Sequence, residues 1–501
     1  MLFALYPLYY QNKYFNMGEA KWIFFRNVTG FFAVFFLIGL IWYLIESLDY
    51  VGKLFSQAKL VLTDYFVLGY LVVSLISSII TPYKSNVLWG YDGWYMGVIA
   101  QICFVIIYLL ISRLYRYDGI LMLVYLASAF LVFFFGVIMR FRIDPMNMYE
   151  GLTEEYIRDF ISTMGQTTWY SSYMCILFPL GLIAFWLYDE RWKRISFGIF
   201  TAVGFMTMIT QNSDSAFIGF GAMLFLLFWI SMKSNKGLIR FFEIMTIAFA
   251  SFRFMGILRA ACPDAAVPIG DMPEKIMGSN MTLLAAVLCL GIFLGLFYLD
   301  KNQKLDIPRV SFIRYIILAL VLIGMIGMIV YVALNSTGAL PENLSSENNY
   351  LLFDSNWGNN RGSSWIFAFG SFLRGDIVRK LFGAGPDCFY EFVYSFFSQE
   401  LHEKWADGRV LTCAHNEWLN CLVNMGILGL VTYLGSFIAS FKRCMEKAEE
   451  HPELYGVAMA IAAYIGHNFF CYQQIICTPV IFMLMGMAEA VIRYTESEKA
   501  A

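Results

Sequence analysis

His415 is the residue in this sequence whose type and position best suit acid–base chemistry. It is one of only four histidines among 501 residues, and it precedes an apolar run in the stretch "AHNEWLNCLVNMGILGL", residues 414 to 430. Neutral imidazole has an ordinary pKa of about 6.5, so at neutral pH it can accept a proton from a hydroxyl group. Asn416 belongs to the residue types that cap helix N-termini. The stretch therefore predicts either a catalytic base or a pair of residues that only satisfy free amides at a helix start.

A single helical face runs from His415 into the apolar segment that follows. Its members are Leu419, Leu422, Gly426, Gly429 and Tyr433. Glycines on such a face let a neighbouring helix or a lipid tail come close to the backbone. We therefore expect close packing directly below His415.

A second polar cluster lies in the last apolar segments of the chain. His467 and Asn468 are followed there by Gln473 and Gln474. Polar side chains at membrane depth are costly and tend to mark functional cavities. We expect His467 to line the same cavity as His415.

The overall composition places these residues in a membrane protein. Hydrophobic residues make up 59% of the chain, aromatic residues 18% and charged residues 14%, and the mean hydropathy is +0.63. These values lie far outside those of soluble domains. The net charge of -2 does not indicate a nucleic-acid partner. The sequence has no HExxH, Walker or dinucleotide-binding motif and no CxxC pair, so we expect neither a metal nor another cofactor.

Thirteen apolar runs are candidates for transmembrane helices, because a helix that crosses about 30 Å of hydrocarbon needs roughly 17 to 25 residues. They are residues 30–48, 60–80, 94–112, 119–138, 168–188, 195–210, 215–231, 241–257, 281–299, 315–333, 417–441, 455–472 and 474–492. Residues 2–10 form a fourteenth apolar piece, which would cross about half-way if helical and lacks the features of a secretory signal peptide. The predicted fold is all-α and polytopic, with about 13 to 14 transmembrane helices.

Basic residues orient these helices, because short cytoplasmic connections carry an excess of lysine and arginine. With the N-terminus in the cytoplasm, more than half of the lysines and arginines fall in cytoplasmic connections, among them "RWKR" at residues 191–194. Lys13, Lys21 and Arg26 would face outward, against this rule. His415 also faces outward in this orientation.

The outer connection at residues 334–414 is far longer than most others, and long loops more often carry function than structure. Apolar side chains recur at helical spacing from Trp365 to Leu381 while the arginines lie largely off that stripe, which predicts an amphipathic helix on the outer membrane face. "GAGPD" at residues 383–387 ends this helix, and "CFYEFVYSFF" predicts a second interfacial one. Cys388 and Cys413 also lie outside, where a disulfide between them can form.

The chain thus divides into four parts. Residues 1–333 form transmembrane helices with short loops, residues 334–414 the outer loop, residues 415–492 further transmembrane helices and residues 493–501 a cytoplasmic tail.

The pattern of His415 and Asn416, nine residues, Gly426, two residues and Gly429 resembles the signature of the O-antigen ligase and O-antigen polymerase superfamily. An arginine in "NNRGSSW" upstream and "LFGAGPDCF" between the two fit the same family. The resemblance implies the architecture of lipid-linked (GT-C-like) glycosyltransferases. It also implies a multi-pass enzyme of the bacterial cytoplasmic (inner) membrane that moves a glycan from an undecaprenyl diphosphate carrier to a glycan, lipid or protein acceptor at the outer face. Such enzymes need no metal, cofactor or nucleotide sugar.

The resemblance assigns roles to individual residues. His415 would be the base that takes a proton from the acceptor hydroxyl, and Arg361 the fork that binds the leaving diphosphate, since guanidinium matches phosphate oxygens in bidentate fashion. Arg361 could instead only snorkel from an interfacial helix. Asn416 and Glu417 are further candidates for substrate binding. Glu417 either orients His415 or, from its adjacent helical position, faces away from it.

The sequence departs from the family at one position. Many relatives carry an arginine in an earlier outer turn as a second phosphate contact, but "TQNSDSAFIG" has Asp214 there. An acid at this place would repel a diphosphate. Another outward cation would then replace the arginine, with Arg253 and Arg259 as the first candidates and Arg140 and Arg142 as further ones.

Two other functions remain open at this stage. One is a transporter or flippase of lipid-linked glycans, which would place its charges near the bilayer midplane. The other is a protein O-oligosaccharyltransferase of the same superfamily. The sequence does not separate ligase, polymerase and protein glycosylation.

Overall fold

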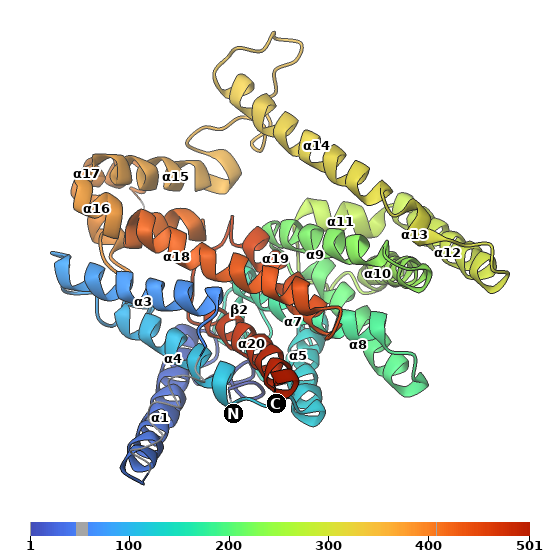
Figure 1. Ribbon diagram of the computed structural model, residues 1–501. Coiled ribbons are helices and arrows are strands. Elements are labelled where there is room, and N and C mark those ends of the chain that lie inside the picture. Colours follow the sequence, from blue (N-terminus) through green and yellow to red (C-terminus); the bar gives the residue numbers. More distant parts are fainter. Residues whose placement is uncertain (1, 47–58, 407, 501) are drawn as a thin grey trace.

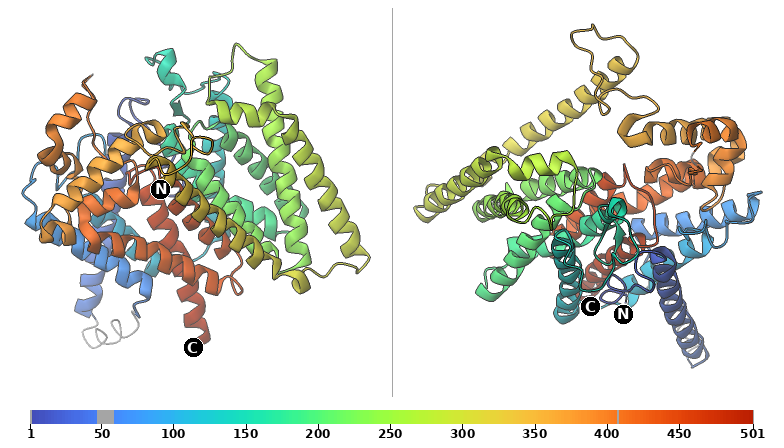
Figure 2. Two further views of the ribbon diagram at one scale, coloured as in Figure 1. Left: turned by 90° about the horizontal axis from the view of Figure 1, so that it is seen from above. Right: turned by 180° about the vertical axis from the view of Figure 1, so that it is seen from behind.

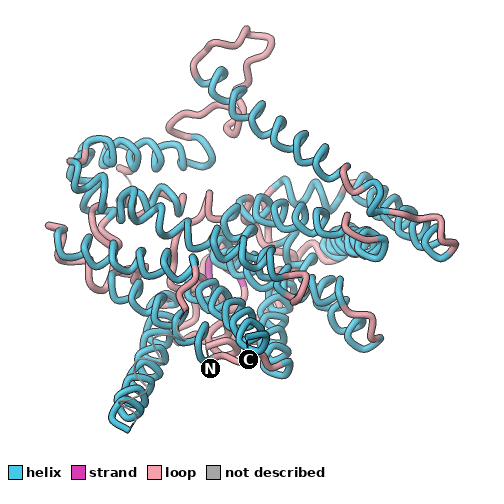
Figure 3. Tube along the Cα trace, in the orientation of Figure 1, coloured by secondary structure: helices cyan, strands magenta, loops and turns pink. Residues whose placement is uncertain are grey.

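The computed structural model describes residues 2–46, 59–406 and 408–500. Nearly all regular structure in this part of the chain is helical, as the tube trace in Figure 3 shows. A helix forms over each of the thirteen predicted runs, of which residues 47 and 48 lie outside the described residues. These helices are α1 (Met17–Glu46), α3 (Leu62–Ile80), α4 (Val98–Leu114), α5 (Gly119–Met139), α7 (Thr167–Leu187), α8 (Arg191–Thr210), α9 (Ser215–Ser231), α10 (Asn235–Ala261), α12 (Asn280–Lys301), α14 (Ile313–Ser336), α18 (Glu417–Lys447), α19 (Leu454–His467) and α20 (Thr478–Ala500).

The helices present apolar side chains outward as well as inward. Eight of those in the described residues are long and apolar enough to cross a membrane, and α4, α9 and α19 are shorter apolar helices. On α14, Ile323 and Ile329 are 65% and 67% exposed. An apolar helix without a buried face is stable where hydrocarbon is the solvent. The protein is therefore an all-α, multi-pass membrane protein.

Helix α7 forms the centre of the packed body. Every residue from Tyr170 to Phe185 is buried. Helix α19 packs against α7 and α9, α20 against α4, and α18 against α3. Helices α7 and α8 approach closely because α8 has a glycine at the contact: a Cβ on Gly204 would lie 2.1 Å from the Phe178 ring. Helices α1 and α14 lead away from this body (Figure 1 and Figure 2).

The N-terminal segment corrects one prediction. Residues 2–8 form turns rather than a half-helix, and the first helix begins at Met17. The buried Lys21 ammonium donates to the backbone carbonyls of Tyr6 (2.6 Å) and Pro7 (2.8 Å). A buried cation needs such acceptors, and the carbonyls of a turn supply them because a helix would have used them internally.

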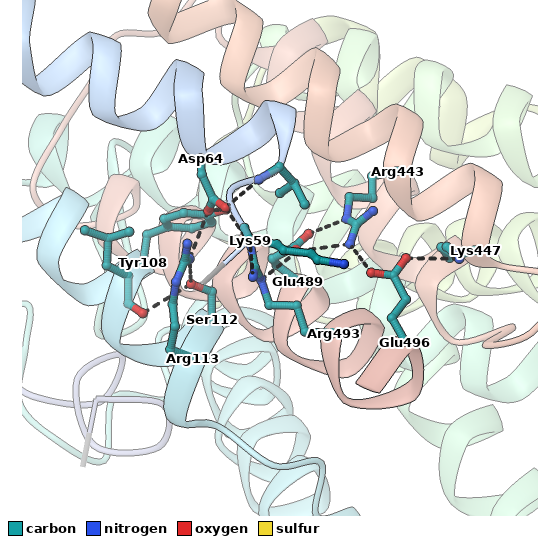
Figure 4. A network of polar contacts seen from close by, with 12 residues as sticks. Lys59, Asp64, Tyr108, Ser112, Arg113, Arg443, Lys447, Glu489, Arg493 and Glu496 are labelled. Carbon is teal, nitrogen blue, oxygen red and sulfur yellow. Dashed lines mark hydrogen bonds and ion pairs between the residues drawn. The ribbon is translucent and has the colours of Figure 1, made fainter. Parts of the chain in front are cut away.

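A network of ion pairs joins α3, α4, α18 and α20 at the helix ends that the charge pattern predicts to be cytoplasmic (Figure 4). The buried Asp64 carboxylate accepts from Arg113 (2.9 Å) and Arg493 (2.5 Å). Glu489 pairs with Arg493 (2.8 Å) and Arg443 (2.6 Å). Each buried carboxylate thus has cationic partners, which a charge at this depth requires. The network gives Asp64 a helix-packing role.

The remaining elements lie in the connections. The short ones are α6 (Glu154–Ile157), α11 (Asp271–Gly278), α13 (Ile307–Val310) and the strands β1 (Phe160–Ile161) and β2 (Gly165–Gln166). The strands form an antiparallel hairpin before α7, with Phe160 opposite Gln166 and Ile161 opposite Gly165.

The long loop after α14 contains three helices, α15 (Trp357–Arg374), α16 (Ile377–Phe382) and α17 (Phe389–Lys404). The predicted amphipathic helix is therefore interrupted, at Gly375, between α15 and α16. Its apolar stripe is exposed, with Leu373 at 54% and Ile377 at 68%. Cys388 and Cys413 are both buried free thiols, so the predicted disulfide is wrong. The Cys388 thiol instead lies 3.5 Å from the carbonyl oxygen of Tyr83.

Candidate functional site

One cavity of about 480 Å³ brings His415 and Arg361 together. Its walls come from the connection between α5 and α7, the start of α7, the turn between α8 and α9, the loop after α14, the start of α15, the segment before α18 and the connection between α19 and α20. Segments more than 200 residues apart in sequence thus converge at one end of the helix bundle. All of these walls lie at the end that the charge pattern predicts to face outward.

The backbone around His415 is held on both sides. The Ala414 N–H donates to the Asn420 side chain (3.1 Å), and the Asn416 side chain accepts from the Leu419 N–H (2.9 Å). The Glu417 N–H donates to the Asn468 carbonyl on the neighbouring connection (2.9 Å). His415 itself has a positive φ of 49°, which an L-residue adopts only when its surroundings enforce it. These contacts fix the backbone of His415, and the residue lines the cavity from this position.

The ring of His415 lies in a partly enclosed, electropositive place. It packs edge-on against Tyr472, with 5.3 Å between ring centroids. Burial of the ring, together with the charge of Arg361, lowers the pKa of His415 to about 4. The imidazole is therefore neutral at pH 7 and able to accept a proton.

Arg361 lies at the irregular start of α15. Gly358 and Asn360 both have positive φ, and the Arg361 Nη1 donates to the Gly358 carbonyl (3.3 Å). The guanidinium stands 5.7 Å from the centroid of Phe470. Burial lowers the pKa of Arg361 from its ordinary value, and a guanidinium remains a cation all the same.

The rest of the "NNRGSSW" stretch fixes this turn. A Cβ on Gly362 would lie 1.8 Å from the Asp354 carbonyl oxygen, so only glycine lets residues 354 and 355 cross the helix here. Ser363 completes the crossing, because its N–H donates to the Ser355 carbonyl (3.0 Å). Arg361 is consequently held between two crossing segments.

Helix α18 is kinked at Gly426, which has φ 68° and ψ -171°. A kink of this kind removes intrahelical donors from the carbonyls before it. The "GAGPD" turn supplies new ones: the Ala384 N–H donates to Val423 (3.0 Å) and the Gly385 N–H to Asn424 (2.9 Å). The glycines after His415 therefore serve to dock the outer loop onto α18, close below the cavity.

The residues next to His415 have structural partners. Asn416 is the N-cap of α18. Glu417 is buried and points into the core, where its carboxylate accepts from Tyr433 (2.6 Å), Tyr464 (3.2 Å) and Asn468. Neither residue lines the cavity as the structure describes it. Glu417 thus ties α18 to α19 rather than contacting the His415 ring.

His467 is buried beside the cavity rather than in its wall. Its Nε2 donates to the carbonyl of Thr168 (3.1 Å), and Thr168 does line the cavity. His467 therefore positions the start of α7 at this site.

The four arginines considered in place of Asp214 lie elsewhere. Arg253 donates to the carbonyls of Met277 (3.1 Å) and Gly278 (2.8 Å), and Arg259 pairs with Glu274 (2.8 Å) in a separate hollow beside α11. Arg142 pairs with Glu154 (2.8 Å). Arg140 is fully buried and donates to the carbonyls of Arg158 (2.9 Å) and Gln211 (3.0 Å). Each is engaged by protein groups away from His415.

Residues 276–434 match the family model described as O-antigen ligase. This match, over about a third of the chain, supports a place in the O-antigen ligase superfamily. The matched region runs from α11 to the middle of α18 and so includes both Arg361 and His415. A comparison with curated proteins gives no match.

The cavity contains two further arginines that the sequence did not single out, Arg158 and Arg409. The backbone of Arg158 is held by Arg140 and by the Asn212 side chain (3.3 Å). Arg158 lies between α6 and β1, and no local motif marks such a position. Only the outward placement of its connection could have suggested it.

The site also includes Asp214, which stands where the family pattern has an arginine. The Tyr350 hydroxyl, from the loop after α14, donates to its carboxylate (3.0 Å). Within the described residues, no group of three or more His, Cys, Asp or Glu side chains could hold a metal ion. The cavity thus contains one neutral imidazole, three guanidinium groups and the carboxylates of Asp159 and Asp214, of which Asp159 pairs with Arg158 (3.6 Å).

Proposed function

We propose that the His415 cavity transfers a glycan from an undecaprenyl diphosphate carrier to an acceptor hydroxyl at the outer face of the membrane. At the family level the protein is a glycan transferase of the O-antigen ligase type. The observation that supports the specific proposal is the convergence of a neutral imidazole and arginine side chains in one cavity.

The proposed reaction is a displacement at the anomeric carbon of the donor sugar. The acceptor oxygen forms a bond to this carbon while the bond from the carbon to the phosphate oxygen breaks, and the diphosphate leaves with the electron pair. The acceptor proton passes to the His415 imidazole. Positive charge beside the leaving group stabilises the charge that develops there.

Three arginines support binding of the diphosphate. Arg361 is the best placed to interact with His415, since its charge already affects the imidazole. Arg158 and Arg409 lie in the same cavity and take the place of the second family arginine. The Asp214 carboxylate accepts a hydrogen bond from Tyr350 but keeps its negative charge, so the arginines have to outweigh it. The three guanidinium groups can share the charge of one diphosphate.

The position of the cavity favours transfer over transport. A flippase would be expected to carry its substrate site near the bilayer midplane, between related halves. The His415 cavity instead lies at the ends of α7, α8 and α19. The buried charges of the Asp64 network are paired with each other, as Figure 4 shows.

Release of undecaprenyl diphosphate by the purified protein tests the proposal. With a lipid-diphosphate glycan and a panel of glycan, lipid and peptide acceptors, we expect turnover that EDTA does not change. His415→Ala should lower the rate by about 10²- to 10⁴-fold, as loss of a general base does. The acceptor that is consumed distinguishes ligase, polymerase and protein glycosylation.

Two control variants separate catalysis from folding. His402→Ala makes the same change in the outer loop, where the His402 ring is bonded within its own helix α17, and should keep the wild-type rate. Asn416→Ala should chiefly lower the free energy of unfolding, by about 1 kcal/mol for a lost N-cap. A wild-type rate in His415→Ala would exclude the proposed base.

A further inference from the structure

A second large cavity lies at the opposite end of the same helices. It has a volume of about 430 Å³ and is formed by the start of α5, the end of α7, the start of α8, the start of α19 and the middle of α20. The His415 cavity lies at the start of α7 and beyond the ends of α8 and α19. The two cavities therefore open at opposite membrane faces, and this one faces the cytoplasmic leaflet in the predicted orientation.

The interior of this cavity is apolar. Leu126, Leu180, Ile183, Leu484 and Ala488 line it and are buried. Its volume is in the range of sites that bind small molecules. An unfilled apolar cavity loses dispersion contacts along its whole wall, and a membrane provides hydrocarbon chains at this depth.

The mouth of the cavity is aromatic and charged. Tyr117 and Trp192 are 48% and 55% exposed, as expected for side chains at the level of lipid headgroups. Both signs of charge are present there. The Lys193 ammonium stands 4.2 Å from the centroid of Tyr188, while Asp118 and Glu453 bring carboxylates to the same mouth.

These charges suit a headgroup that carries both signs. A phosphate would be drawn to Lys193, which already pairs with Glu190 (2.6 Å) and so is held in place. A primary ammonium would be drawn to Glu453, whose present partner is His451 (3.5 Å). A purely anionic headgroup could pair with Lys193 as well, but it would bring no cation to Asp118 and Glu453.

We propose that this cavity binds one acyl chain of an aminophospholipid from the cytoplasmic leaflet, with the phosphate at Lys193 and the ammonium at Glu453. The lipid fills the space between α5 and α8 on one side and α19 and α20 on the other. This site does not depend on the reaction at His415.

Native mass spectrometry of the purified full-length protein tests the site. The protein is titrated with phosphatidylethanolamine and, separately, with phosphatidylglycerol of the same acyl chains. Wild type should bind phosphatidylethanolamine about tenfold more tightly, which corresponds to about 1.4 kcal/mol. Glu453→Gln should remove this preference, and Lys193→Gln should weaken binding of both lipids.

Cavity-filling variants test the acyl site separately. Ala184→Trp should lower binding of phosphatidylethanolamine by about tenfold or more, about 1.4 kcal/mol. Ile323→Trp, on the exposed face of α14, should bind like wild type. If Ala184→Trp does not elute as a single species, Ala488→Phe fills the cavity from α20. Equal affinity of wild type for the two lipids, or unchanged binding in the cavity-filling variants, would overturn the proposal.

Discussion

The imidazole of His415 is kept neutral by its surroundings. Burial is the larger cause of its low pKa and the Arg361 cation the smaller one. A bound diphosphate would offset the charge of Arg361, so the pKa of His415 should rise when the donor is present. The proposed base is thus weak in the free protein and stronger in the complex in which it is needed.

The pH dependence of turnover tests this electrostatic account. Because kcat/KM reports groups of the free enzyme, we expect it to stay level at neutral pH and to fall as the pH drops through about 4, where His415 gains a proton. Arg361→Gln removes a charge that lowers the pKa of His415. The pKa should therefore rise, and the remaining activity should begin to fall at a higher pH than in wild type. Initial rates measured across pH give the midpoint of this activity loss for wild type and for the variant. A midpoint at about 6.5 in wild type would contradict a lowered pKa of His415.

Substitution of Arg361 distinguishes a role that needs only its positive charge from one that needs the planar shape of the guanidinium group. If it only snorkels, Arg361→Lys retains the cation and the aliphatic stem, and activity should barely change. If it clamps the diphosphate, lysine lacks the planar fork, and a loss of about tenfold or more is expected, with a larger one for Arg361→Ala. The measurement is turnover at saturating and at limiting donor. Wild-type turnover in Arg361→Ala under both conditions would rule out the clamp.

At the scale of elements, the contact of α16 with α18 supports the site. Gly383 and Gly426 both have positive φ, and each would place a Cβ within 2.4 Å of backbone atoms of the other segment. This contact joins the outer loop, which carries Arg361, to the helix that begins just after His415. The distance between the two functional residues therefore depends on two glycines.

Substitution of these glycines should weaken the contact between α16 and α18. Gly426→Ala forces an alanine into a backbone region that is essentially restricted to glycine, at a cost of about 1–3 kcal/mol before the clash with Leu381 is counted. Gly324→Ala, on α14 with no heavy atom within 4 Å of the added Cβ, is the matched control and should not lower the Tm, because alanine is the better helix former. Thermal unfolding followed by intrinsic fluorescence compares the two. Equal Tm values for both variants would mean that the kink does not need glycine.

At the scale of the whole molecule, every step of the proposed reaction requires the His415 cavity to face outward. Ser345 and Ser398 lie in the exposed outer loop, and Glu449 follows the other end of α18. In a background without native cysteines, cysteines placed at Ser345 and Ser398 should react with a membrane-impermeant thiol reagent on intact cells, and one at Glu449 should not. The inverse labelling pattern would place the cavity on the wrong side for a donor presented outside.

The sequence by itself determined the class of the molecule and the location of its helices. Hydrocarbon leaves no alternative partner for backbone amides, so an apolar run of sufficient length must become a helix. This is why each of the thirteen predicted runs contains a helix within the described residues, and why the motif around His415 showed a family resemblance before any contact was known. Residues 2–10 departed from this rule because the run is too short to cross and the Lys21 ammonium uses its carbonyls.

Only the tertiary structure decided which side chains meet. Arg158 and Arg361 reach one cavity from connections about 200 residues apart, whereas Arg253 and Arg259 are satisfied beside α11. Glu417 turns into the core because Tyr433, Tyr464 and Asn468 converge on it there. Helical periodicity places each residue on its own helix but carries no information about the neighbour, which is set by close packing over the whole bundle.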